Sequence, residues 1–143
     1  MHSNPQPLDI IRCYFSLPVP VKKLQQTSRL LYKKEHVPLT QGISVVFCSD
    51  SAIRKLNARY RHIDHATDVL SFTMGDNDLL GEIYISLQRA AIQARRYRVT
   101  YQEEVVRLFI HGFYHLLGYD HKTERGYKEM EKKEKKAFTR FVD

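Results

Sequence analysis

Three histidines in the C-terminal part of the chain have the spacing of metal ligands. His111, His115 and His121 lie in the segment HGFYHLLGYDH. Residues four apart on a helix are separated by about 40° around the axis and about 6 Å along it, so His111 and His115 share one face. Gly118 permits the turn that would bring His121 back to the same point. Three imidazoles are the ligand set of an open catalytic zinc site, with water in the fourth position. The sequence therefore predicts one metal ion, with zinc favoured and other first-row ions left open.

The residue after the first histidine limits the chemistry of such a site. The histidine spacing equals that of the metzincin proteases, HExxHxxGxxH. Those enzymes carry a glutamate general base directly after the first histidine, and Gly112 stands at that position here. A glycine side chain accepts no proton, so peptide hydrolysis by this route lacks its base. A metalloprotease is therefore a minor alternative.

Together with two further segments, the histidine motif resembles the YbeY family of bacterial ribosomal RNA maturation factors. Residues 56–72, LNARYRHIDHATDVLSF, are similar to the family pattern N-x-x-Y-R-x-x-D-x-P-T-D-V-L-S-F, with Ala66 in place of the proline. Residues 80–86, LGEIYIS, are similar to L-G-D-I-x-I-S, and the spacing of Met130 and Glu134 also fits. The resemblance extends from about residue 50 to the C-terminus and implies an α+β layer as the fold.

The resemblance also implies a function. It implies a zinc-dependent, single-strand-specific endoribonuclease that acts in small-subunit ribosomal RNA 3′-end maturation and in ribosome quality control. His111, His115 and His121 correspond to the ligands of one Zn²⁺ ion, and Arg61 corresponds to the functional arginine of the substrate cleft. The segment Asp68 to Phe72 would line that cleft. The implied partners are single-stranded RNA, ribosomal RNA and the small ribosomal subunit, with no DNA and no membrane.

Arg61 has a physical reason to act on a phosphate. Its guanidinium stays charged and offers several donors in a fixed fork, which suits a phosphate whose charge grows during cleavage. The alternatives are an ordinary surface arginine or a structural pair with Asp64 or Asp68. Asp120 either orients the imidazole of His121 or forms a turn. His62 and His65 are expected to have no special role, although both lie near the predicted site mouth.

Two questions stay open at the level of the sequence. The proton acceptor for RNA cleavage is a hydroxide at the metal, the 2′-hydroxyl of the RNA or an unidentified side chain. Because no base is evident, a second reading is a ribosome assembly factor that cleaves nothing and whose zinc is mainly structural.

Composition and charge indicate the kind of partner and the cellular location of the protein. The formal net charge of +7 and the pI near 9.5 favour anionic partners. The N-terminus has no signal-peptide pattern, and no apolar stretch approaches the roughly 20 residues of a membrane span. Cys13 and Cys48 each lie alone in an apolar segment, so we expect two buried, reduced thiols. These features predict a cytoplasmic protein.

Periodicity and capping residues predict the elements that must position the histidines. Strands are expected at Asp9 to Phe15, from Gly42 through residue 49, at 69–72 and at Leu80 to Ile85, with a turn at 75–78. Helices are expected from Val21 to Glu35, from a cap at Ser49 or Asp50 to Tyr60, from a Ser86 cap to Tyr97, from a Thr100–Glu103 capping box to Gly118, and from Glu124 to Phe141. The order βαβαββααα predicts one α+β domain over residues 1–143, in which a small mixed sheet of about four strands packs against about five helices. The expected architecture is zincin-like, with the histidine-bearing helix at its centre.

Overall fold

The computed structural model describes residues 7–74, 78–119 and 123–142, of which 139–142 are described by their backbone alone. Within these residues the elements follow the order predicted from the sequence. The strands are β1 (Leu8–Arg12), β2 (Gly42–Cys48), β3 (Val69–Thr73) and β4 (Leu79–Ser86). The helices are α1 (Val21–Lys34), α2 (Asp50–Arg61), α3 (Leu87–Tyr97), α4 (Tyr101–Leu116) and α5 (Glu124–Val142).

The strands form one mixed sheet in the order β1-β2-β4-β3. β1, β2 and β4 are parallel, and β3 runs antiparallel to β4. β3 is therefore an edge strand, with one side free of a strand partner in this sheet. The predicted fold class, α+β with a small mixed sheet, is confirmed.

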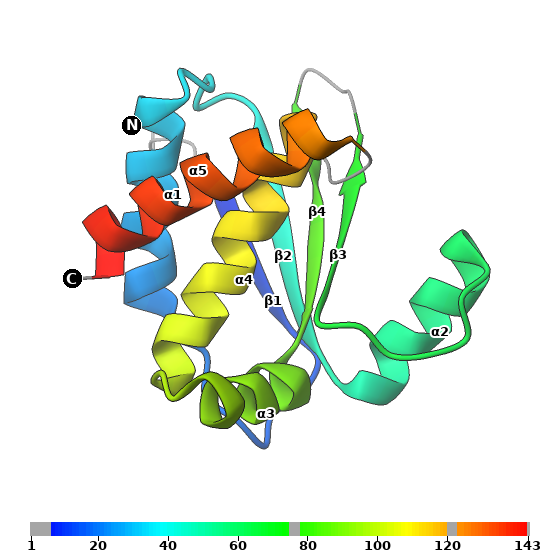
Figure 1. The fold of residues 1–143 in the computed structure, drawn as a ribbon. Helices are drawn as coiled ribbons and strands as arrows, with labels where there is room; N and C mark the ends of the chain where they lie inside the picture. Colours follow the sequence, from blue (N-terminus) through cyan, green and yellow to red (C-terminus); the bar gives the residue numbers. More distant parts are fainter. Residues whose placement is uncertain (1–6, 75–77, 120–122, 143) are drawn as a thin grey trace, which may run out of the picture.

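Three helices form a layer on one face of the sheet. α4 packs on β3 and β4, α1 packs beside α4, and α5 crosses over α4 on the outside, as Figure 1 shows. α4 is apolar on most sides because it is enclosed by the sheet and by three helices; Val105, Phe109 and Phe113 are fully buried. Met130 anchors α5 to this core. The central position predicted for the histidine-bearing helix is thus observed.

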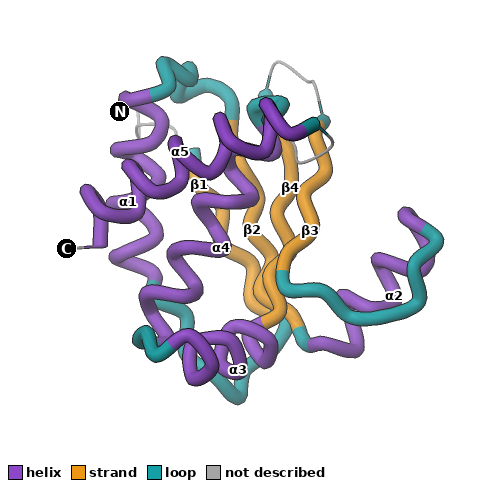
Figure 2. Tube along the Cα trace, in the orientation of Figure 1, coloured by secondary structure: helices purple, strands orange, loops and turns teal. Residues whose placement is uncertain are grey.

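α2 lies apart from this layer, beyond the β3 edge of the sheet (Figure 2). Alternate residues of a strand face opposite sides, so Leu70 and Phe72 point away from α4. Leu70 joins Cys48 and Ile53 in a second, smaller core under α2. The segment after α2 then returns the chain to β3, and this return creates the site described below.

The helix ends explain why these segments fold where the sequence predicts. The side chains of Ser49 and Ser86 accept hydrogen bonds from backbone N–H groups in the first turns of α2 and α3. Thr100 and Glu103 form the predicted capping box of α4. α4 ends in a Schellman motif: Gly118, with φ of 98°, donates to His115, and Tyr119 donates to the carbonyl of Tyr114. The chain therefore turns sharply just after the second histidine.

Two predictions near the N-terminus are wrong. β1 ends at Arg12 rather than Phe15, because its partner β2 ends at Cys48 and continues into α2. Cys13 lies just after this shortened strand and is exposed, whereas Cys48 is buried as predicted. Both thiols are free. The predicted turn at 75–78 falls largely outside the described residues.

In the part of the chain that the structure describes, every helix falls short of the length or the apolar character of a transmembrane span.

Candidate functional site

The C-terminal half of α4 presents two imidazoles side by side. The Nε2 atoms of His111 and His115 are 3.2 Å apart, and their ring centroids are 4.7 Å apart. Both side chains are partly buried. The helix brings the two rings together because four residues make slightly more than one turn. The predicted pairing of these two histidines on one face is observed.

This geometry is compatible with a shared metal ion. Two nitrogens bound at 2.0–2.1 Å to one tetrahedral zinc ion are about 3.3 Å apart. A hydrogen bond between two imidazoles has a similar length, so the separation alone does not identify a metal. Among the described residues, no three metal-ligating side chains gather at one point. The predicted third ligand, His121, and its neighbour Asp120 lie outside the described residues.

A glutamate from α5 contacts the far side of the first imidazole. The Nδ1 atom of His111 is 2.7 Å from Oε1 of Glu134, and each side chain is about one-fifth exposed, at 19% and 20%. A carboxylate at Nδ1 favours the tautomer that carries its proton there, which leaves the lone pair of Nε2 directed toward His115. This is the usual second contact of a metal-binding histidine. The sequence had placed Glu134 in the last helix without assigning it this role.

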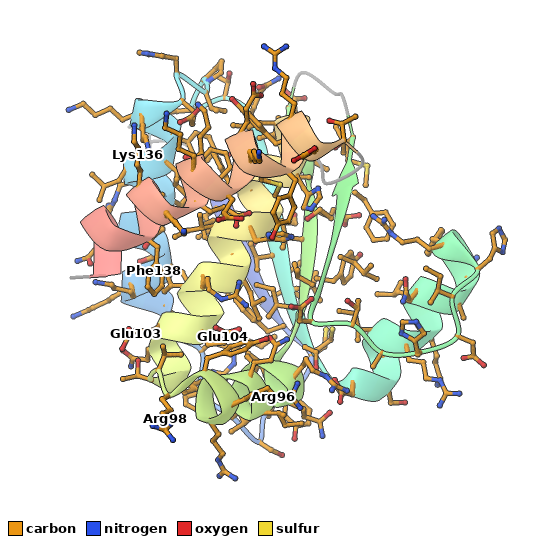
Figure 3. The ribbon with its side chains drawn as sticks, in the orientation of Figure 1. Arg96, Arg98, Glu103, Glu104, Lys136 and Phe138 are labelled. Carbon is orange, nitrogen blue, oxygen red and sulfur yellow. The ribbon has the colours of Figure 1, made fainter. Side chains whose placement is uncertain are left out.

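An ion pair with a buried carboxylate and a partly exposed guanidinium, Glu104 with Arg107, precedes His111 on α4. Glu104 is 1% exposed, and both its oxygens accept hydrogen bonds from Arg107, at 2.8 and 2.6 Å. These bonds raise the pKa of the guanidinium, and the nearby carboxylates of Asp68 and Glu134 act in the same direction. Figure 3 shows Glu104 on the lower turns of α4, above α3. Arg107 therefore provides positive charge among three carboxylates beside the histidines.

The two histidines form one wall of a pocket of about 240 Å³. The other walls come from α2, the segment after it and β3. The described lining residues are Asn57, Arg61, Ile63, His65, Thr67, Val69, Leu70, Ser71, His111 and His115. The pocket thus joins two separate stretches of the chain, residues 57–71 and the C-terminal half of α4, at the free edge of β3.

Arg61 lies in this pocket with the histidines, as the sequence predicted. Its guanidinium donates a hydrogen bond of 3.1 Å to the carbonyl of Ser71 and lies 5.8 Å from the ring centre of Phe72. The two structural pairs considered for it are not observed: Asp64 pairs with Arg54, and Asp68 accepts from Gln93. Because a guanidinium has five N–H donors, the bond to Ser71 fixes its direction and leaves capacity for an anion.

Two polar residues of the motif, Asn57 and Asp68, hold the backbone around the pocket in place. Asn57 is buried, donates 3.0 Å to the carbonyl of His65 and accepts 3.2 Å from the N–H of Ile63. Asp68 accepts from the N–H of Val69 at 2.8 Å. Of the segment predicted to line the cleft, Val69, Leu70 and Ser71 do so, whereas Asp68 and Phe72 are not among the lining residues.

Gly112 is required by close packing of α4 on the sheet. A Cβ atom at this position would lie 2.7 Å from Cγ2 of Ile83 and 3.1 Å from Oγ of Ser71. The carbonyl of Gly112 also accepts a hydrogen bond of 3.3 Å from the Ser71 hydroxyl. The position that carries the general base in metzincins therefore has no room for a glutamate here.

Comparisons with known proteins agree with the motif resemblance. Residues 18–142 match a protein family described as Endoribonuclease YbeY. The Endoribonuclease YbeY of Desulforamulus reducens is 44% identical over 124 residues, which cover 80% of this chain and 81% of that protein. That of Geobacillus thermodenitrificans is 38% identical over 134 residues, which cover 85% and 86%. The solution structure of a Thermotoga maritima protein, 30% identical, aligns with a TM-score of 0.64 over 92% of this chain and 86% of that one.

Proposed function

The chain belongs to the YbeY endoribonuclease family, and we propose that it is itself a zinc-dependent endoribonuclease that cleaves single-stranded ribosomal RNA. The observation that carries the proposal is the position of Arg61 in one pocket with the paired imidazoles of His111 and His115. A fixed cation beside two metal-type ligands is suited to stabilise the charge that develops when a phosphodiester is cleaved.

The proposed metal ligands are His111, His115 and His121. The separation of the first two Nε2 atoms and the carboxylate of Glu134 behind His111 support this assignment. When bound, zinc supplies a Lewis acid for a phosphate oxygen and makes a nearby water molecule more acidic. Arg61 would bind the same phosphate and offset the charge that develops as the bond breaks.

The residues of the pocket walls reduce the number of candidates for the proton acceptor. Among the described lining residues there is no carboxylate, and Gly112 has no room for one. Attack by the 2′-hydroxyl of the RNA would leave a 2′,3′-cyclic phosphate and a 5′-hydroxyl, whereas attack by water would leave a phosphate monoester on one product. Analysis of the product ends therefore separates these routes.

The proposed setting is the small ribosomal subunit in the cytoplasm, where the enzyme would mature the 3′ end of the small-subunit RNA. The net charge of +7 supports binding of RNA through its phosphates. The site architecture also weakens the metalloprotease alternative, since its base position is closed by Ile83 and Ser71.

The proposal is tested by metal content and RNA cleavage measured together. Wild type, Arg61→Ala and His115→Ala are purified, checked for folding, and assayed on a single-stranded ribosomal RNA fragment. We expect about one zinc per wild-type chain, and loss of cleavage in both folded variants. Equal residual cleavage in all three proteins would indicate a contaminating nuclease and would favour the assembly factor with structural zinc. In that case His115→Ala should lower the melting temperature sharply.

A further inference from the structure

An exposed tyrosine lies at the end of α2, next to the arginine of the pocket. Tyr60 is 56% exposed and is not part of the small core under α2. Its ring nevertheless makes an ordered contact, since it meets the ring of Phe72 edge-on at 5.6 Å between centroids. Phe72 in turn meets Tyr84 edge-on at 5.7 Å. An exposed ring is thus held in place by a partly buried one.

Each ring of this aromatic pair has an arginine next to it. The guanidinium of Arg59 lies over Tyr60, 5.3 Å from its ring centre. Arg61 lies 5.8 Å from the ring centre of Phe72 and also lines the histidine pocket. Arg61 therefore lies between the pocket, which it lines, and Phe72, whose ring Tyr60 meets edge-on.

We propose that Tyr60, supported by Phe72, is a stacking subsite for one unpaired base next to the phosphate that Arg61 binds. The inference rests on the proposed function and extends it to the recognition of the RNA. Single-stranded RNA binds proteins through aromatic faces that stack on its bases and cations that follow its phosphates. A base paired in a duplex has no free face for Tyr60, so the subsite selects unpaired RNA.

The positive charge continues beyond the tyrosine. Arg59 and Lys55, one turn apart on α2, both line an open hollow of about 550 Å³. Arg54, on the same hollow, is paired with Asp64 at 3.0 Å. Lys55 and Arg59 therefore supply cations for the phosphate on the far side of the stacked base. Figure 1 shows α2 beyond the β3 edge of the sheet, and Lys55 and Arg59 are both exposed.

The chain contains a matched control for the subsite. Arg59-Tyr60-Arg61 and Arg96-Tyr97-Arg98 are the same tripeptide, and Tyr97 is 55% exposed. The second copy lies at the end of α3 and does not line the histidine pocket. Figure 3 shows Arg96 and Arg98 on the lower part of the molecule, with α2 to the right. Comparison of the two tyrosines separates a subsite beside the pocket from a general effect of exposed aromatic and basic residues.

The experiment measures single-turnover cleavage of a labelled single-stranded oligoribonucleotide that has one mapped cut. Tyr60→Ala should raise the half-saturating protein concentration by between about 5-fold and about 150-fold, the range for loss of one stacked base. Tyr60→Phe, which keeps the ring, should rescue most of this loss. Tyr97→Ala should change the half-saturating protein concentration less than about twofold, because an isolated surface substitution rarely affects binding at a distant site.

Abasic oligonucleotides identify the stacked base. An abasic nucleotide directly beside the cut should weaken binding by the wild type as much as Tyr60→Ala does, and the two changes together should cost no more than either alone. Equal effects of Tyr60→Ala and Tyr97→Ala, or additive effects of Tyr60→Ala with every abasic position, would overturn the subsite while cleavage by the wild type persists. A wild type that neither binds nor cleaves the oligonucleotide would overturn the proposed function and the subsite with it.

Discussion

Removal of the Glu134 carboxylate should weaken metal binding without unfolding the protein. The carboxylate lies 2.7 Å from Nδ1 of His111, and both side chains are about four-fifths buried. Loss of such a partner of a ligating histidine typically lowers metal affinity 10- to 100-fold, or about 1.4 to 2.7 kcal/mol. The loss of affinity for Glu134→Ala should lie near the upper end of this range. The loss for Glu134→Gln should lie near the lower end, because an amide keeps a polar oxygen close to Nδ1 but carries no charge.

Zinc affinity is measured by competition with a chromophoric chelator, and thermal unfolding is followed in parallel. Glu131→Gln is the matched control, since Glu131 lies on the same helix, is 45% exposed and pairs only with Lys135 at 3.3 Å among the described contacts. Its zinc affinity should equal that of the wild type. The reasoning is refuted if folded Glu134→Ala binds zinc as tightly as Glu131→Gln does.

Three further predictions follow from individual contacts. Gly112→Ala should lower the melting temperature. Overpacking against Ile83 costs about 1–3 kcal/mol, which exceeds the gain of about 1 kcal/mol in helix propensity. A variant with a higher melting temperature would contradict the close approach of α4 to the sheet. Arg61→Lys should reduce cleavage at least about tenfold, because a lysine keeps the charge but loses the fork of donors; unchanged single-turnover rates would show that a point charge is enough. Cys13 should react with iodoacetamide at pH 8 in the native protein while Cys48 does not, because burial, with smaller contributions from Cys13 and Asp50, raises the pKa of the Cys48 thiol to about 12. Peptide mass spectrometry measures both thiols, and equal labelling would contradict this difference.

Local signals in the sequence were sufficient for the element order and for much of the site. Capping residues such as Ser49, Ser86 and Thr100 act through neighbours in sequence, so they predict helix starts directly. The spacing of His111 and His115 is likewise a property of one helix. These features needed no knowledge of the tertiary structure.

Contacts between distant segments were beyond the sequence. The partner of His111 is Glu134, which reaches it only because α5 crosses over α4. The alternative partners weighed for Arg61 were near it in sequence, yet its bond goes to the backbone of Ser71 on the edge strand. The sequence pointed to Glu134 only through its four-residue spacing from Met130, which places the carboxylate on the same side of the last helix as that buried residue.

The most direct test of the account is a zinc titration of the metal-stripped full chain, followed by single-stranded RNA cleavage. The proposal predicts that cleavage is absent without metal, rises in proportion to added zinc and saturates near one equivalent. His115→Ala should show no such rise at any zinc concentration, while remaining folded. Cleavage that persists in the stripped wild type, or that is restored equally in His115→Ala, would contradict a catalytic metal held by these histidines.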